Sequence, residues 1–189
     1  VKDHSVSKET FSLLYNKEYD ILKTHPTPSL DVLPKYYESE DYISHTDGKR
    51  TLFEKIYHLV KRNAIKGKVS LLNKEQNSKG KLLDIGCGTG DFLVEAKNQG
   101  WSILGFEPNS DAKQLAANKD VSFTEDIFAL PENTFDVVTM WHVLEHVPNL
   151  TEYITNLKRI VKPNGTIIIA VPNYKSYDAK YYNRFWAAY

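Results

Sequence analysis

The most constraining feature of this sequence is a short apolar segment that leads directly into three closely spaced glycines. Residues 81–90 read Lys-Leu-Leu-Asp-Ile-Gly-Cys-Gly-Thr-Gly. The apolar part is typical of a buried strand, and the glycines let the backbone turn tightly and approach a ligand. A helical pattern follows from residue 91. A strand, a glycine turn and a helix in this order predict the first βαβ unit of a sheet, with a binding site at the carboxyl end of the strand.

Strands and helices continue to alternate along the chain. The expected strands span residues 81–85, 102–106, 121–123, 135–140 and 166–171. The expected helices span residues 52–69, 91–98, 110–118 and 150–161. This alternation predicts an α/β fold with a doubly wound, Rossmann-like and mostly parallel sheet that carries helices on both faces. We expect residues 1–50 to form a helical or irregular appendage and residues 51–189 one domain, whose sheet is either short or lacks its last strands.

Composition narrows the class of protein. The 24 Lys and Arg residues balance the 24 Asp and Glu residues, so no overall field attracts nucleic acid or an anionic membrane. The single cysteine, Cys87, cannot form an internal disulfide, which favours a reducing, cytoplasmic location. No apolar run is long enough to span a membrane. We therefore expect no nucleic-acid partner and no membrane insertion, and the oligomeric state stays open.

Two acids accompany the glycine turn. Asp84 lies within the strand, where an acid is unusual if both faces are buried, so we expect it to point to the open end of the sheet. Glu107 ends the next strand, where an acid can accept hydrogen bonds from ribose hydroxyls. Dinucleotide sites share this spacing, but the third glycine, Gly90, comes one residue early for their fingerprint. An ordinary tight turn is the alternative reading of the glycines.

Several ordered motifs resemble those of class I S-adenosylmethionine-dependent methyltransferases, especially the group of ubiquinone-biosynthesis O-methyltransferases and related small-molecule enzymes. The resemblance covers about half of the chain. Asn164 stands where glycine is commoner in the family, a mild departure because asparagine tolerates a left-handed backbone. The motifs that carry the resemblance are the turn at 83–90, the strand end at 105–109, Glu125-Asp126-Ile127, the strand start at 135–138 and the turn at 161–166.

The resemblance implies a site for S-adenosyl-L-methionine. The three glycines would pack against its methionine part, Asp84 would reach its amino group through water, and Glu107 would hold the ribose hydroxyls. Asp126 would accept a hydrogen bond from the adenine amino group, unless it is a solvated turn acid, and Phe106 or Ile127 would form an apolar wall. The expected cofactor-binding residues are Asp84, Gly86, Cys87, Gly88, Gly90, Phe106, Glu107, Pro108, Asp126, Ile127, Trp141 and Tyr42.

The segment Trp141-His142-Val143-Leu144-Glu145-His146 follows a strand at the same sheet edge. His142 is the candidate catalytic residue, either contacting the sulfonium or acting as a general base toward an acceptor hydroxyl. Its alternative role is packing or hydrogen bonding within a loop, which we also expect of Glu145 and His146. We expect no metal, because a third well-spaced ligand is missing.

Two tyrosine-rich segments each have two interpretations. Tyr36, Tyr37 and Tyr42 either form a lid over the cofactor or pack as ordinary aromatics. Tyr174, Tyr177, Tyr181, Tyr182 and Trp186 either line the acceptor pocket or form a docking face.

The function predicted from these observations is S-adenosylmethionine-dependent methyl transfer to a small-molecule acceptor, at oxygen. Methyl transfer from a sulfonium mainly requires positioning of the reactants and exclusion of water. The alternatives are a non-catalytic module that binds S-adenosylmethionine and, less favoured, an NAD-dependent oxidoreductase. The sequence does not name the acceptor.

Overall fold

The computed structural model describes residues 1–3, 7–29, 32, 52–186 and 188–189, with side chains in the first helix from residue 56 onward. Contacts between Cα atoms divide the chain into two compact units. One comprises residues 49–171, and the other joins residues 1–48 to residues 172–189. The second unit therefore takes its residues from both ends of the chain. The domain division expected from the sequence stays a prediction.

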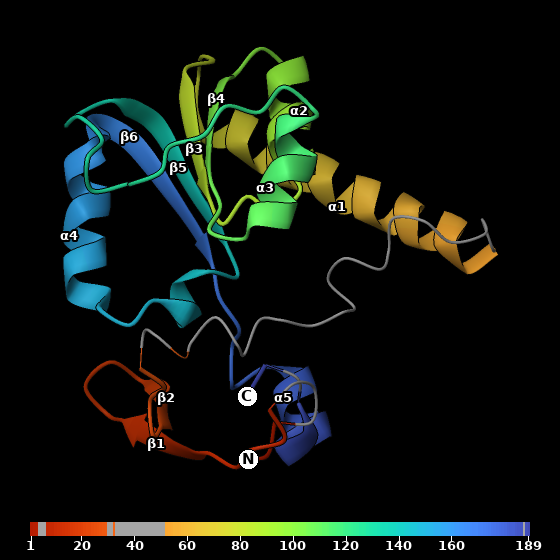
Figure 1. Ribbon diagram of the computed structural model, residues 1–189, viewed down its shortest axis with the longest axis vertical. Helices are drawn as coiled ribbons and strands as arrows, with labels where there is room; N and C mark the ends of the chain where they lie inside the picture. Colours follow the sequence, from red (N-terminus) through yellow and green to blue (C-terminus); the bar gives the residue numbers. More distant parts are fainter. Residues whose placement is uncertain (4–6, 30–31, 33–51, 187) are drawn as a thin grey trace. The chain divides into compact units, whose positions relative to one another are not determined.

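The larger unit is built on a four-stranded parallel sheet, as expected (Figure 1). Its strands lie in the order β4-β3-β5-β6, so the chain first moves from β3 to β4 and then returns to the other side of β3. The strand order thus reverses between β3 and β5, and ligands of open α/β sheets bind at the carboxyl ends of strands at such a point. The strands are β3 (Lys81–Ile85), β4 (Ser102–Phe106), β5 (Phe135–Trp141) and β6 (Val161–Ala170).

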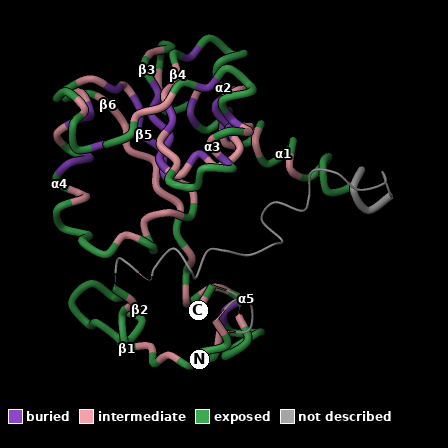
Figure 2. Tube along the Cα trace, viewed as in Figure 1, coloured by how far each residue is buried: buried purple, intermediate pink, exposed green. Residues whose placement is uncertain are grey.

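Helices cover both faces of this sheet. Alternate side chains of a strand point to opposite faces. Accordingly, Leu82 packs in a cluster with residues of α1, α2 and α3, whereas Leu83 packs in a second cluster with residues of α4. The buried positions of this unit follow the strands in Figure 2. The helices are α1 (Leu52–Glu75), α2 (Asp91–Asn98), α3 (Ser110–Ala117) and α4 (Leu150–Ile160).

Three segments differ from the sequence-based expectation. The first helix extends to Glu75 and does not end at residue 69. The segment 121–123 is not a strand, because only Phe123 forms a bridge, to Gly105. β6 begins at Val161 and so includes the residues expected to form a turn before it. Gly165 permits this path, because a Cβ there would lie 2.9 Å from the carbonyl oxygen of Asp136. The register with β5 shifts at this point.

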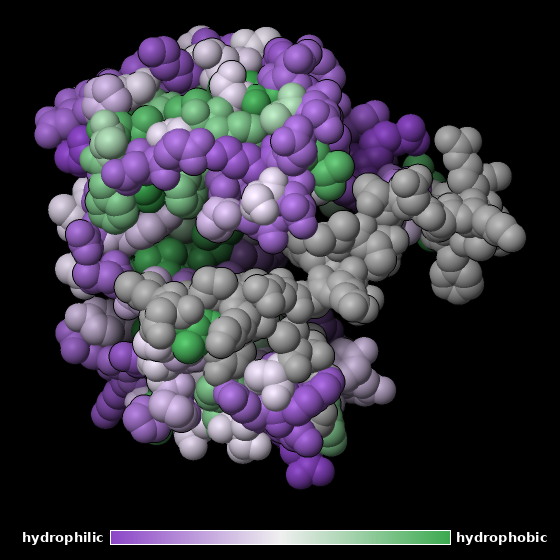
Figure 3. Space-filling model, viewed as in Figure 1, coloured by the Kyte–Doolittle hydropathy of each residue, from purple (hydrophilic) through white to green (hydrophobic). Residues whose placement is uncertain are grey.

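The edges of the larger unit are partly apolar. β6 is an edge strand of the sheet, and residues 165–170 are half-buried. On the face of this unit seen in Figure 3, hydrophobic residues reach the surface between hydrophilic ones. Among the described residues, no helix is long and apolar enough to cross a membrane.

The smaller unit contains an antiparallel hairpin of β1 (Ser12–Asn16) and β2 (Ile21–His25). The expectation of a helical or irregular appendage is wrong for this segment. The side-chain oxygen of Asn16 accepts hydrogen bonds from the backbone N–H groups of Glu18 and Tyr19, which fixes the turn between the strands. Both strands are largely exposed, so they lack the apolar alternation by which strands are recognised.

Asp20 connects this hairpin to the other end of the chain. Its carboxylate accepts hydrogen bonds from the hydroxyls of Tyr15, at 3.0 Å, and Tyr174, at 2.5 Å, and it pairs with the ammonium of Lys175. The bonds from Lys175, Tyr174 and Tyr15 lower the pKa of Asp20 to about 2. The C-terminal segment continues into α5 (Tyr177–Tyr182), on which the rings of Tyr177 and Tyr181 are stacked.

Candidate functional site

The glycine turn joins β3 to α2 in a conformation that other residues rarely adopt. Gly86, Gly88 and Gly90 have φ angles of 71°, 52° and 76°. A Cβ on Gly86 would overlap the side chain of Val143, and one on Gly90 would lie 2.8 Å from the Cβ of Ala116. Both the backbone conformation and the close packing therefore require glycine at these two positions.

Glu107 follows β4 and reaches the glycine turn. One carboxylate oxygen accepts a hydrogen bond from the backbone N–H of Gly88 at 2.8 Å, and the other accepts one from Asn109 at 3.0 Å. The carbonyl oxygen of Phe106 accepts a bond from Gly86 N–H at 2.8 Å. The end of β4 and the turn therefore form one hydrogen-bonded structure with a carboxylate at its edge.

Asp84 is a buried acid in the central strand, with only 2% of its surface exposed. The hydroxyl of Thr139 on β5 donates a hydrogen bond to its carboxylate at 2.6 Å. Burial raises the pKa of Asp84 to about 7, although the bond from Thr139 and the charge of Lys68 act in the opposite direction. Asp84 thus changes its charge near neutral pH, at the sheet edge where the ligand of such a fold binds.

Cys87, inside the turn, is buried. Burial and the neighbouring charges of Asp84 and Glu107 raise the pKa of its thiol to about 12. Its side chain therefore stays a neutral thiol at physiological pH and acts as a packing group.

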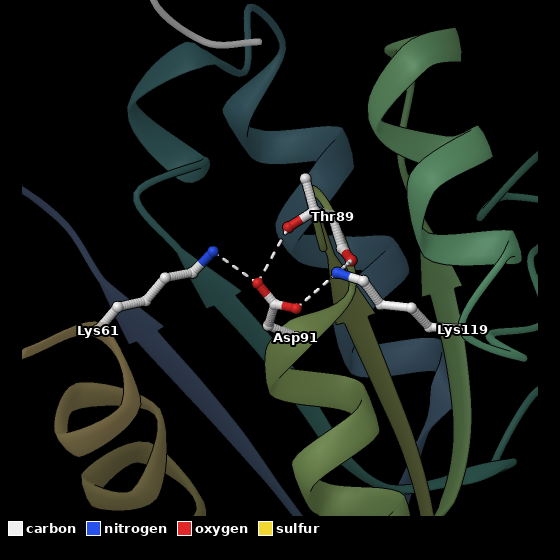
Figure 4. Close-up of polar contacts among 4 residues, drawn as sticks. All are labelled: Lys61, Thr89, Asp91 and Lys119. Carbon is white, nitrogen blue, oxygen red and sulfur yellow. Dashed lines mark hydrogen bonds and ion pairs between the residues drawn. The ribbon is translucent and has the colours of Figure 1, made fainter. Parts of the chain in front are cut away.

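An ion-pair network holds the start of α2 beside the turn (Figure 4). Asp91 lies 2.6 Å from the ammonium of Lys61 on α1 and 2.5 Å from that of Lys119. Lys119 also donates to the carbonyl oxygen of Thr89, whose hydroxyl donates to Asp91. Partial burial acts to raise the pKa of Asp91, but the bonds from Lys119 and Lys61 outweigh it and leave the pKa lowered. The network ties the turn to two further segments of the chain.

His142 lies at the end of β5, and its neighbour Val143 packs against Gly86. The residue has a φ of 60°, its side chain is 65% exposed, and its Nδ1 lies 3.6 Å from Glu145. The histidine therefore borders the glycine turn and is open to solvent. Both the catalytic and the loop-packing role fit this position, and its catalytic role stays a prediction.

Trp141, which precedes His142, packs edge-on against Phe92 of α2. Its indole Nε1 is buried, and it is the one buried side-chain nitrogen or oxygen in the described part of the chain that has no hydrogen-bond partner. A buried donor without a partner is rare in folded proteins.

The residues expected beside the adenine differ in how far they are buried and in what they contact. Asp126 is exposed, and its carboxylate accepts a bond from the N–H of Phe128 at 2.8 Å, as a turn acid does. Ile127 is 2% exposed and packs in the cluster with α4, while Phe106 is half-buried and Pro108 exposed. Their contacts with a cofactor stay predictions.

The remaining expectations concern tyrosines and metals. Tyr36, Tyr37 and Tyr42 lie outside the described residues. Within those residues, no group of three His, Cys, Asp or Glu side chains is arranged to hold a metal ion.

Sequence reasoning missed two side chains beside Asp84. Thr139 is a hydroxyl residue within the otherwise apolar strand Phe135–Trp141, which is a signal visible in the sequence. Lys68 on α1 places its ammonium 4.5 Å from the centre of the Trp141 ring. Nothing in the sequence distinguishes Lys68 from the other lysines of that helix, because its position depends on tertiary packing.

The parallel sheet, the glycine turn at its strand-order reversal and the acid after β4 define an α/β domain that binds a nucleotide-type cofactor. A family model described as a methyltransferase domain matches residues 50–188, and the chain belongs to this family. This membership decides against the oxidoreductase alternative.

Individual relatives agree with the family. The chain is 30% identical over 135 residues to the ubiquinone biosynthesis O-methyltransferase of Rickettsia typhi, covering 67% of this chain and 54% of that protein. It is 28% identical over 155 residues to the demethylmenaquinone methyltransferase of a Geobacillus species, covering 70% and 64%. The crystal structure of a SAM-dependent methyltransferase from Archaeoglobus fulgidus is similar with a TM-score of 0.56 and 25% identity, covering 66% and 61%. The chain thus spans between half and two thirds of these proteins.

The overlap at Gly86 predicts an energetic coupling with Val143. Gly86→Ala is expected to lower the free energy of unfolding by about 2–4 kcal/mol, because it adds backbone strain and steric overlap. Adding Val143→Ala should recover about 1 kcal/mol of this loss in a double-mutant cycle measured by urea unfolding. The matched control is Gly67→Ala on α1, where an added Cβ meets no atom within 4 Å. This substitution should raise the free energy of unfolding slightly, because alanine favours the helix. Strictly additive effects of the two substitutions would contradict the overlap.

The raised pKa of Asp84 predicts the pH dependence of stability. The folded-state pKa of Asp84, about 7, lies above its ordinary value of 3.8. The protonated Asp84 therefore stabilises the folded protein at low pH, and this stabilisation is lost as the pH rises through 7. Asp84→Asn, which cannot ionise, should exceed the wild type in unfolding free energy by roughly 1–3 kcal/mol at pH 8, with little difference at pH 4.

Asp136→Asn provides a control of opposite sign. Lys162 and the N–H of Lys81 donate to Asp136, and its pKa is lowered, so this variant should be less stable than the wild type at pH 8. Urea unfolding at several pH values measures both variants. An Asp84→Asn variant that is less stable than the wild type at pH 8 would contradict the buried charge.

Proposed function

We propose that this protein uses S-adenosyl-L-methionine to methylate a small-molecule acceptor at oxygen. The observation that carries the proposal is the meeting of three features at one sheet edge: the glycine turn, the Glu107 carboxylate bonded to it, and the buried Asp84. Membership of a methyltransferase family supports the cofactor. Since the chain spans only part of the relatives' length, activity and acceptor are inferred for the domain described.

The residues present suit the cofactor. The glycine turn places no side chain over the half-buried backbone of Gly86 and Gly88, where the methionine part would pack, and Glu107 offers carboxylate oxygens to two ribose hydroxyls. Asp84 supplies a negative charge for the amino group. Asp126 accepts from the adenine amino group, and Trp141 contributes an indole N–H that has no partner in the described part of the chain.

S-adenosylmethionine supplies an activated methyl group on a sulfonium. The protein's own residues orient the two reactants in line and exclude water between them. His142 accepts the proton of the acceptor hydroxyl as the methyl group is transferred to its oxygen. Glu145, at 3.6 Å from the Nδ1 atom of His142, stabilises the imidazolium that results.

The names of two relatives support an acceptor class. One relative is a ubiquinone biosynthesis O-methyltransferase and the other a demethylmenaquinone methyltransferase. We infer that the acceptor is a small ring compound of the quinol type with a free hydroxyl group.

Cofactor binding tests the first part of the proposal. Isothermal titration calorimetry with S-adenosylhomocysteine should give micromolar affinity, about −8 kcal/mol. Glu107→Ala should weaken binding about tenfold or more, because a charge-assisted hydrogen bond contributes about 1.5–3 kcal/mol. Glu132→Ala, which removes an exposed acid elsewhere in the same unit, should bind like the wild type. Binding of NAD instead, or of neither compound, would refute the proposal.

Turnover tests the second part. With a catechol as probe acceptor, His142→Ala should lower kcat by about a hundredfold and leave the affinity for S-adenosylhomocysteine unchanged, because the base acts on the acceptor only. Release of S-adenosylhomocysteine measures the rate. An unchanged kcat would assign His142 to the loop, and binding without any turnover over a range of quinol-type probes would favour the non-catalytic module.

A further inference from the structure

Three side chains form a row on the sheet face that α1 and α2 cover. Asp84 and Thr139 are register partners on β3 and β5, and Thr139 donates its hydroxyl hydrogen to Asp84. Trp141 lies two residues beyond Thr139 and so points to the same face. It packs with the cluster that contains Val69 of α1 and Phe92 of α2. The row therefore begins at the buried acid and ends at the tryptophan beside His142.

Lys68 places a positive charge over this row. It is half-buried on α1, next to the fully buried Val69, and its ammonium lies 4.5 Å from the centre of the Trp141 ring. Burial lowers the pKa of Lys68, and the charge of Asp84 acts to raise it. The ammonium of Lys68 thus contacts the aromatic face of Trp141, two residues along β5 from the Thr139 that binds Asp84, and its charge acts on Asp84 through space.

The groups around Asp84 act on its ionisation in opposite directions. Glu107, which follows β4, disfavours ionisation of Asp84, and the neutral thiol of Cys87 in the turn carries no charge. The hydroxyl of Thr139 on β5 and the ammonium of Lys68 on α1 favour the carboxylate. Among the described groups that act on Asp84, Lys68 is the only cation.

We propose that Lys68 is a positioning residue that favours the carboxylate form of Asp84 and thereby sets the pH range in which the cofactor binds. This inference rests on the proposed function, in which the cofactor's ammonium group meets Asp84. The aromatic face of Trp141 gives the Lys68 ammonium a partner besides Asp84. When Asp84 takes up a proton or faces the cofactor's ammonium, the Lys68 cation keeps an aromatic partner and is not left unpaired.

The titration of Asp84 tests this inference without any cofactor. Carbon-13 NMR of its carboxyl group in the ligand-free protein should give a midpoint near pH 7 for the wild type. Lys68→Met keeps the length of the stem and removes the charge, so the midpoint should rise by about one pH unit. Lys68→Arg should restore it. Lys66→Met, an exposed lysine on the same helix, should leave it unchanged.

An unchanged midpoint in Lys68→Met would overturn the inference. Lys68→Gln is a second uncharged variant, which decides the matter if Lys68→Met does not fold.

The pH profile of S-adenosylhomocysteine binding separates an electrostatic role from a merely structural one. At pH 7 the affinity of Lys68→Met should be about fivefold lower than that of the wild type, and above pH 8.5 the two should converge as Asp84 becomes ionised in both. A loss by the same factor at every pH would mean that Lys68 only packs against Trp141. If the wild type binds no S-adenosylhomocysteine, the proposed function fails, and the carboxyl titration still decides the role of Lys68.

Discussion

The arrangement of the site depends on one constraint, the burial of a carboxylate at the end of the central strand. β3 has a neighbouring strand on each side and helices over both faces, so the side chain of Asp84 is removed from water. A buried charge is costly unless it is paired or hydrogen-bonded. The hydroxyl of Thr139 and the ammonium of Lys68 offset part of this cost. The pKa of Asp84 is still raised, so part of the cost of burying the charge remains. Perturbed acids of this kind are typical of functional sites, where stability is given up for charge in a defined place.

The glycine turn depends on its neighbours for its shape, because Gly86, Gly88 and Gly90 have no side chains with which to fix it. Glu107 binds its backbone from β4, Val143 packs on it from the segment after β5, and Lys119 binds its Thr89 carbonyl oxygen. Each of these contacts comes from a different part of the chain. The left-handed backbone is therefore fixed before any ligand arrives, which lowers the entropy that binding must cost.

The sequence predicts the centre of this fold well and its periphery poorly. β3, α2 and β4 have the bounds expected, because glycines and polar residues interrupt strong apolar patterns there. The sequence places Glu107 at the strand end beside the turn, since parallel neighbouring strands end at the same edge, but its hydrogen bond to the N–H of Gly88 was not predicted. The hairpin was missed because its strands are exposed and carry no apolar alternation.

Lys68 shows a different limit of sequence reasoning. The long helix α1 carries many lysines, and only the packing of Val69 and Leu72 determines which of them faces the sheet. Asp126 is an acid in the expected place, but its carboxylate bonds to the N–H of Phe128, a local choice that a motif does not specify.

The smaller unit is discontinuous, and this has a consequence for the order in which the protein folds during synthesis. Asp20 receives its bond from Tyr174 across 154 residues of chain. Chains emerge from the ribosome N-terminus first, and domains generally fold as units as they emerge. The hairpin therefore waits for its partners in residues 172–189 while all of residues 49–171 are made, so the sheet domain can fold before the smaller unit is completed.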